Sequence, residues 1–124
     1  MSLSLSMVTF DTHDAPALAA WWAPHLGGQV QAYDDEFVMV LPTGPGRPAF
    51  GFQRVDDPTP GKNRVHVDLG ADDPAAWVER LVAAGATRVA AHSMPDGFAW
   101  TVLADPHGNQ FCVSAVHDAA PPAV

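Results

Sequence analysis

His66 and Asp68 are the residues whose types and spacing are best suited to chemistry in this sequence. They lie two positions apart in a predicted strand, so their side chains should stand side by side on one face. A carboxylate beside an imidazole can orient the ring and stabilise its protonated form, which suits a catalytic general base or a ligand-binding pair. The structural alternative is a hydrogen-bonded pair that satisfies its own polar groups or binds a water molecule.

Other polar and aromatic side chains are predicted to face a cavity from neighbouring strands. If Val8 and Phe10 pack beneath a helix, the alternating side chains of Met7 and Asp11 face the other way. Trp100 lies in a later predicted strand on the cavity side, where its indole could stack on a ligand. Packing in the core is the alternative role for this side chain.

The charge balance bears on the class of partner. Six Lys and Arg residues stand against fourteen Asp and Glu residues, which gives a formal net charge of −8. This argues against a nucleic-acid partner, because such binding depends on Lys and Arg side chains that meet phosphates. An acidic surface favours cationic ligands. The alternative is that the charge serves solubility alone.

The sequence also argues against a membrane protein and against nucleophile-based enzymes. No apolar run approaches the ~20 residues that a membrane-spanning helix needs. Ser6 and Ser114 have no Gly-x-Ser-x-Gly context, and no glycine-rich phosphate loop precedes a helix.

Cys112 is the single cysteine, so the fold does not depend on a disulfide, which fits a cytoplasmic protein. Its expected role is that of a small buried hydrophobe.

An internal repeat appears when the chain is shifted by 59 positions. The first predicted strands then overlay, with Val8 on Val67. The predicted helix starts overlay too, with Asp14 on Asp73, each followed by a proline in the first turn, which is typical of a helix N-terminus. Further matches are Met7 on His66, Leu18 on Trp77, Trp22 on Leu81, Phe52 on Phe111 and Gln53 on Cys112.

Each copy begins with a strand and a helix and is predicted to continue with three more strands. The first strands are expected at 7–12 and 64–70, and the helices end at the glycines Gly27, Gly28 and Gly85. The later strands, separated by runs rich in Asp, Pro and Gly, are expected at 29–33, 37–41 and 49–55, and at 86–92, 98–103 and 110–116.

These elements predict an α+β fold built from two β-α-β-β-β modules. The chain of 124 residues suits one domain. Module one is expected at about 5–56, a linker at 57–63, module two at about 64–117 and a tail at 118–124. Two such modules can form an eight-stranded curved sheet, or incomplete barrel, with the helices outside. A small molecule would bind in the concave cleft between the modules.

The sequence resembles the vicinal-oxygen-chelate superfamily of glyoxalase and bleomycin-resistance proteins. The resemblance rests on Val-His-Val-Asp-Leu at 65–69, on Ala-Asp-Pro-His-Gly-Asn-Gln-Phe at 104–111 and on the helix at 17–28, and it covers about 7–116. The motif at 60–66 is similar to a glyoxalase-like subgroup. The resemblance implies two-module binding proteins or enzymes, which commonly pair into homodimers.

The resemblance also implies four positions that hold a divalent metal in the catalytic members. Here they carry Met7, Gln53, His66 and Cys112. Hard divalent ions prefer carboxylates and imidazoles, so a thioether, an amide and a thiol make a poor set, and only His66 is a good general ligand. We therefore expect no metal and no other cofactor. A soft site for Cu(I) is the chemical alternative.

Three functions remain open. The first is metal-independent binding of a small cationic or aromatic molecule, with Met7, Asp11, Gln53, Trp100 and Cys112 as ligand-binding residues. The second is a lyase or isomerase of the glyoxalase type, acting on a small carbonyl compound with His66 as base or metal ligand and Asp68 beside it. The third is an interaction protein with an empty cleft. A homodimer could use Trp21, which points away from the core residue Trp22.

Overall fold

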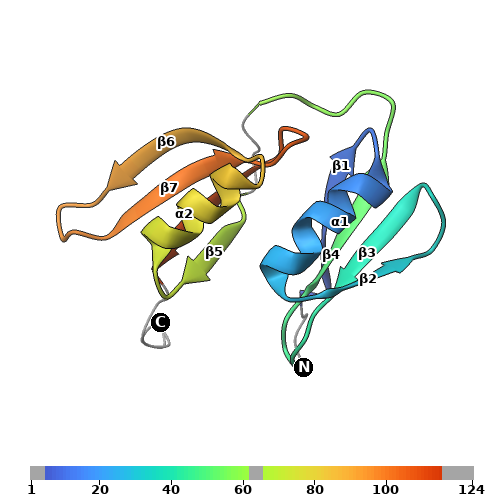
Figure 1. Ribbon diagram of the computed structural model, residues 1–124, viewed down its shortest axis with the longest axis horizontal. Coiled ribbons are helices and arrows are strands. Elements are labelled where there is room, and N and C mark those ends of the chain that lie inside the picture. The colour runs from blue at the N-terminus through green and yellow to red at the C-terminus, as the bar shows by residue number, and fades with distance from the viewer. Residues whose placement is uncertain (1–4, 62–65, 116–124) are drawn as a thin grey trace. The chain divides into compact units, whose positions relative to one another are not determined.

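The computed structural model describes residues 5–61 and 66–115, and these form two β-α-β-β-β modules (Figure 1). Module one comprises β1 (Met7–Thr12), α1 (Ala15–Leu26), β2 (Gln29–Ala32), β3 (Phe37–Leu41) and β4 (Ala49–Arg54). Module two comprises β5 (Asp68–Ala71), α2 (Pro74–Ala83), β6 (Thr87–Ser93), β7 (Ala99–Ala104) and β8 (Gln110–Ala115). The predicted α+β class and the two copies of one unit are confirmed.

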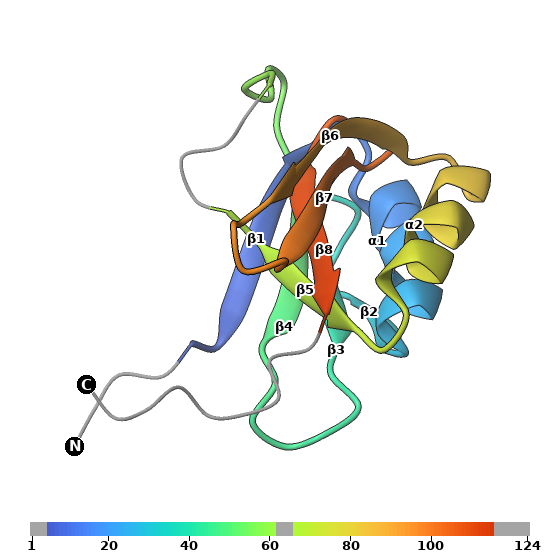
Figure 2. The ribbon, with the colours of Figure 1, turned by 90° about the vertical axis from the view of Figure 1, so that its left-hand side faces the viewer.

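Each module has its own four-stranded mixed sheet. The strand order is β1-β4-β3-β2 in module one and β5-β8-β7-β6 in module two. The first strand of each module runs parallel to the last, and the other pairs are antiparallel. Each helix lies on one side of its own sheet (Figure 2). The chain divides into two compact units between Pro60 and Gly61.

The helices begin where the sequence predicts, because an aspartate caps each one. The Asp14 carboxylate accepts a hydrogen bond from the amide of Ala17 at 3.1 Å, and Asp73 does the same for Ala76 at 3.1 Å. Each bond satisfies an amide that has no partner within its helix. Gly27 ends α1 in the left-handed conformation with a φ of 65°.

The core of module one is aromatic. Phe10 and Phe50 lie with ring centroids 5.4 Å apart, and the Trp22 ring of α1 lies 5.6 Å from each of them. Phe52 completes the cluster against Phe10 and is fully buried. Burying each such ring contributes about 1.5–3 kcal/mol, so this cluster holds α1 on its sheet.

The core of module two uses smaller side chains. Leu81 of α2, Leu103 of β7 and Phe111 and Val113 of β8 are buried. The faces are set by register, because Thr101 lies opposite Val113 and Leu103 opposite Phe111. The face that carries these side chains packs under α2, so the alternate residues face the other way.

Most predicted boundaries lie within a residue or two of the observed ones, but the first strand of module two is an exception. It was predicted from residue 64, whereas β5 begins at Asp68. Residues 64 and 65 lie outside the described part of the chain. His66 is therefore placed just before the strand and not within it.

The predicted repeat spacing of 59 is wrong for the last strand of each module. The register pairs Thr9 with Gly51 in module one and Asp68 with Cys112 in module two. Thr9 and Asp68 are 59 apart, so the last strands are related by a shift of 61, and Cys112 corresponds to Gly51. The hairpin loops of the two modules differ in length, which causes the change. The two spacings differ by two residues, so the side chains of the last strand stay on the same face.

Candidate functional site

We call the sheet face opposite the helix the distal face of each module. In module two this face is set by two rows of register partners that cross the sheet. Asp68 of β5, Cys112 of β8 and Val102 of β7 form the first row. The second row contains Ser114 of β8, Trp100 of β7 and His92 of β6. The side chains in both rows therefore lie on one face, as the sequence predicted for Asp68, Trp100 and Cys112.

Trp100 is the centre of an aromatic cluster on β6 and β7. Its ring centroid lies 5.3 Å from that of His92, with an angle of 31° between the rings. The ring centroid of Phe98 lies 6.1 Å from that of Trp100, with an angle of 33° between the rings. Because Trp100 is half-buried, part of its indole stays accessible to a ligand.

His92 and Phe98 were not predicted as site residues. His92 is exposed near the end of β6, yet its ring packs against that of Trp100. The signal that could have found it is the cross-strand pairing of His92 with Trp100, which requires the hairpin register.

The predicted catalytic pair, His66 and Asp68, is solvent-exposed. His66 precedes β5, and Asp68 is the first residue of that strand. Within residues 5–61 and 66–115, no hydrogen bond or ion pair joins the His66 imidazole to the Asp68 carboxylate. The assignment of a catalytic role to them stays a prediction.

The distal face of module one brings Met7, Phe37 and Thr9 together over Gly51. A Cβ atom on Gly51 would lie 2.6 Å from the Met7 Sδ, 2.9 Å from the Phe37 Cζ and 3.1 Å from the Thr9 Oγ1. The bare backbone of the glycine thus lets a thioether and a ring close over the sheet. The Met7 and Phe37 side chains form an apolar surface there. Of these two, only Met7 is among the site residues predicted from the sequence.

Asp11 and Gln53 form the polar edge of the same face. They are register partners in the parallel pair β1 and β4, and Phe37 lies opposite Gln53 on β3. Asp11 and Gln53 are exposed. The predicted ligand-binding residues Met7, Asp11 and Gln53 therefore share one face of module one.

A buried carboxylate organises the turn before β8. The Asp105 side chain is 3% exposed and accepts hydrogen bonds from the amides of His107 at 2.9 Å and Asn109 at 3.0 Å. The Asn109 Nδ2 donates to its other oxygen at 3.1 Å. This explains the Asp-Pro-His-Gly-Asn sequence, because the carboxylate supplies the acceptors that the turn amides need.

A family model described as "Glyoxalase-like domain" matches residues 7–114, which include both modules and this turn. The chain belongs to the glyoxalase-like domain family. Its fold is that of the glyoxalase/bleomycin resistance/dioxygenase superfamily. No curated protein sequence matches this glyoxalase-like domain.

Solved structures of low sequence identity share the fold. A glyoxalase/bleomycin resistance protein/dioxygenase family enzyme from Burkholderia phytofirmans is 23% identical, with a TM-score of 0.73 over 93% of this chain and 100% of that one. The bleomycin-binding protein from Streptomyces verticillus, complexed with copper(II)-bleomycin, is 19% identical with a TM-score of 0.64 over 94% and 99%. Lactoylglutathione lyase from Agrobacterium tumefaciens is 17% identical with a TM-score of 0.67 over 93% and 95%.

The donor set of this glyoxalase-like domain does not fit the hard divalent metal that the superfamily resemblance implies. The four carried-over positions hold a thioether, an amide, an imidazole and a thiol, with no carboxylate. In module one, the Met7 sulfur is turned onto Gly51 next to the Phe37 ring. Within the described ranges, no three His, Cys, Asp or Glu residues gather closely enough to hold a metal.

Proposed function

We propose that this glyoxalase-like domain binds a small cationic, partly aromatic molecule on the distal face of module two, without a metal. The observation that carries the proposal is the contact of Trp100 with His92 and Phe98, because Trp100 and His92 lie on the face that also holds Asp68. An indole attracts both flat rings and cations, and a carboxylate pairs with a positive charge.

The spacing of these groups sets the size of the ligand. Asp68 and Trp100 are separated by two strand intervals across the sheet and by one row along it. That corresponds to about 12 Å between their Cα atoms for strands about 4.8 Å apart with a rise of about 3.4 Å per residue. A ligand with a ring at one end and an ammonium group at the other would reach both.

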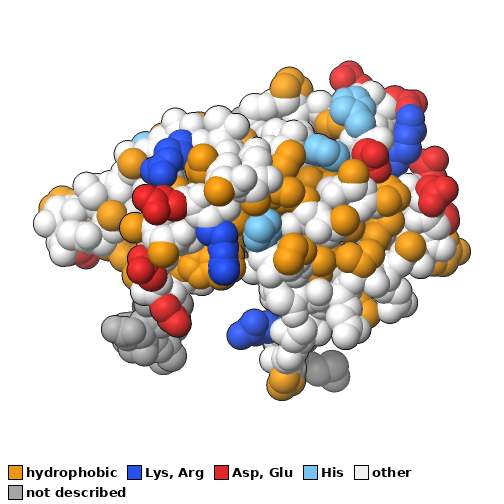
Figure 3. Space-filling view, viewed as in Figure 1, with side chains coloured by type: hydrophobic (Ala, Val, Ile, Leu, Met, Phe, Trp, Pro, Cys, Tyr) orange, Lys and Arg blue, Asp and Glu red, His pale blue; other side chains and the backbone are white. Residues whose placement is uncertain are grey.

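The charge distribution supports a cationic ligand. Acidic side chains lie over both modules in the view of Figure 3, whereas the basic side chains in that view stand apart from one another. The net charge of −8 gives the protein a negative field that attracts cations. Asp68 and Asp11 are exposed carboxylates on the distal faces.

Metal independence rests on ligand chemistry. A glyoxalase-type reaction needs the developing enolate to be stabilised, and a carboxylate-bound divalent ion is one way to do so. Of the four positions carried over from the metalloenzymes, only His66 holds a good general ligand, and Met7, Gln53 and Cys112 are poor ligands for such an ion. Their neutral and soft side chains suit the packing of an organic ligand better.

The direct test is calorimetric titration with benzyltrimethylammonium and with bleomycin, the latter chosen because a relative of the same fold binds it. We expect saturable binding that Trp100→Ala weakens by about tenfold or more, since stacking on an indole contributes on the order of 1 kcal/mol or more. Trp21→Phe on α1 is the matched control and should keep the affinity. Equal affinities of the Trp100→Ala variant and the wild type would refute the proposal.

Metal content is the complementary measurement. The protein is loaded with Ni²⁺, Co²⁺, Mn²⁺ or Zn²⁺, desalted and examined by mass spectrometry. We expect no stoichiometric retention. Retention that is lost in His66→Ala would contradict metal independence and would favour the enzymatic alternative.

The alternative function is a lyase or isomerase acting on a small carbonyl compound. The feature that favours it is the exposed His66 two positions from Asp68, where an imidazole can accept a proton and a carboxylate can stabilise the resulting cation. Incubation with the adduct of methylglyoxal and glutathione, followed by thioester absorbance, tests it. Turnover by the wild type that is lost in His66→Gln would establish this alternative.

Neither α1 nor α2, the helices of the described ranges, has the length and apolar character of a membrane-spanning helix.

We further propose a cytoplasmic homodimer. Trp21 is half-buried against Trp22 and His25, with ring centroids 5.1 and 4.5 Å away, and presents its remaining surface outside the core. Light scattering after size-exclusion chromatography measures the mass directly, and a monomer at all concentrations would contradict this proposal.

A further inference from the structure

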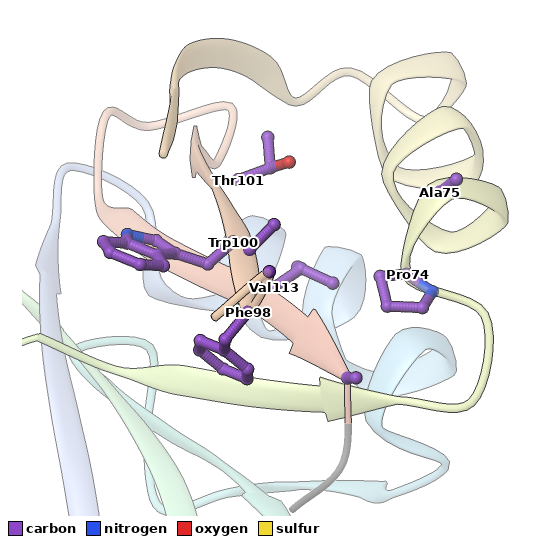
Figure 4. Close-up of a pocket in the computed structure, with 9 residues that line it drawn as sticks. Pro74, Ala75, Phe98, Trp100, Thr101 and Val113 are labelled. Carbon is purple, nitrogen blue, oxygen red and sulfur yellow. The ribbon is translucent and has the colours of Figure 1, made fainter. Parts of the chain in front are cut away.

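A cavity of about 390 Å³ lies in module two between the start of α2 and the beginning of β7, and its lining includes the rings of Phe98 and Trp100. Figure 4 shows Pro74 and Ala75 at the start of α2 on one side of it, with Thr101 and Val113 on the sheet. Ala115, the last residue of β8, lines one end of the cavity, and Trp100 lies at its rim. The lining belongs to module two alone.

The cavity exists because α2 leaves part of its sheet uncovered. In module one, α1 packs on all four strands, whereas α2 packs mainly on β5 and β8. Strand β7 therefore has a helix-side surface that α2 does not fill. The residues of β7 and β8 near the start of α2 then form the floor of the cavity.

Smaller side chains in module two also enlarge the cavity. The register shows that Thr101 and Val113 of module two correspond to Val38 and Phe52 of module one. Phe52 is fully buried and Val38 is 1% exposed, so these two positions are filled in module one. In module two a valine replaces the phenylalanine, and the volume of the missing ring is left open.

The residue of module two that corresponds to Val38 is the polar Thr101. A hydroxyl at a core position is not a neutral replacement for a methyl group, because it needs a hydrogen-bond partner. The Thr101 side chain makes no hydrogen bond within residues 5–61 and 66–115. Figure 4 shows its oxygen on the side of the cavity that faces Pro74 and Ala75. A hydrogen-bonding group thus stands open in an otherwise apolar lining.

We propose that this cavity is a second ligand site, which binds a compact neutral molecule with one ring and one hydroxyl or carbonyl group. Its volume is near the small end of the range for ligand pockets, which limits the ligand to roughly one ring. The lining contains no charged side chain, so an ion would lose hydration without gaining a partner. The ring occupies the space of the missing phenyl group, and the polar group bonds to Thr101.

The test uses phenol as the probe and ¹⁵N-labelled full-length protein. Titration should produce saturable shifts of the backbone amides of Ala75, Thr101 and Ala115. Benzoate, a similar ring with a negative charge, should bind at least about tenfold more weakly, because its carboxylate is desolvated without a cation. Shifts that do not saturate, or that spread evenly over the module, would overturn the proposal.

Two substitutions test the fit. Val113→Phe restores the ring of module one and should abolish phenol binding. Thr101→Val keeps the volume and should weaken binding about fivefold, the effect of one neutral hydrogen bond. If Val113→Phe does not fold, Ala115→Leu at the exposed edge should block the entrance instead. Retention of wild-type phenol affinity in a folded Val113→Phe or Ala115→Leu variant would overturn the proposal.

The cavity shares the Trp100 and Phe98 rings with the proposed distal-face site, but Asp68 does not line it, so one variant at Asp68 separates the two. Asp68→Asn should weaken binding of benzyltrimethylammonium and leave phenol binding unchanged. If phenol binds and the cation does not, the proposed function fails while the second site stands. If the cation binds and phenol does not, the second site fails alone.

Discussion

Trp100 occupies in module two the register position that Phe37 occupies in module one. Trp100 lies opposite Ser114, and Phe37 lies opposite Gln53, which is the residue of β4 equivalent to Ser114. Each module thus places an aromatic ring at the start of its third strand, on the distal face. Module one closes this ring over Gly51 with Met7, whereas module two flanks it with His92 and Phe98.

The difference between the two rings predicts which one recognises a ligand. The Phe37 Cζ lies over the backbone of Gly51 beside the Met7 Sδ, so part of this ring is used for packing. Trp100 is the larger ring, and a cation binds more strongly to an indole than to a phenyl group.

Asp68 should make binding of a cationic ligand dependent on salt. The carboxylate is exposed, so its attraction for benzyltrimethylammonium is screened as sodium chloride rises. We expect Asp68→Asn to weaken binding at low salt by up to about fivefold, the range of an exposed ion pair, and to flatten the salt dependence. Asp35→Asn, in an exposed turn of module one, is the matched control. An unchanged salt dependence in Asp68→Asn would remove this carboxylate from the site.

Gly51→Ala should disturb the distal face of module one. The new Cβ would lie 2.6 Å from the Met7 Sδ and 2.9 Å from the Phe37 Cζ, so both side chains must move. Because these are the far ends of rotatable side chains, we expect a modest loss of about 1 kcal/mol in unfolding free energy. Urea denaturation measures it. Gly44→Ala is the control, since the nearest atom to its Cβ is 3.9 Å away, and an equal loss there would contradict the explanation.

The sequence predicted the elements well because their signals are local. β1 and β3 have the predicted bounds, and both helices begin after the predicted aspartate caps. Alternation along a strand likewise placed Met7 and Asp11 on the face opposite the helix. These features depend on residues a few positions apart, which a single sequence displays directly.

The register and the aromatic cluster could not be predicted in the same way. The constant spacing of 59 fails after the helices because the hairpin loops differ in length, and loop length leaves little trace in an alternating pattern. His92 contacts Trp100 only through that register. The cavity beside Thr101 depends on how far α2 extends over its sheet, which is a property of packing and not of any local motif.

Cys112 should behave as a packed side chain and not as a reactive thiol. It is 7% exposed and lies between Asp68 and Val102 in the register. A buried thiol is poorly accessible to a reagent, so reaction with a disulfide reagent should be slow. We expect the rate in the folded protein to be at least about a hundredfold below that in urea. Equal rates under both conditions would show that the thiol is accessible in the native state.

Asp105 should be the most stabilising carboxylate of the turns. It is buried and accepts hydrogen bonds from the amides of His107 and Asn109 and from the Asn109 side chain. Asp105→Ala leaves these donors without their acceptor, so we expect a loss of about 2–4 kcal/mol in unfolding free energy.

Asp96→Ala is the matched control for that variant. Asp96 accepts a single amide bond, from Phe98 at 2.9 Å, in an exposed turn of the same module. Its replacement should cost about 0.5–1 kcal/mol, because water can satisfy the released amide. Urea denaturation of both variants gives the comparison. Similar losses would mean that burial of Asp105 adds nothing, and the Asp-Pro-His-Gly-Asn turn would then need an explanation other than stability.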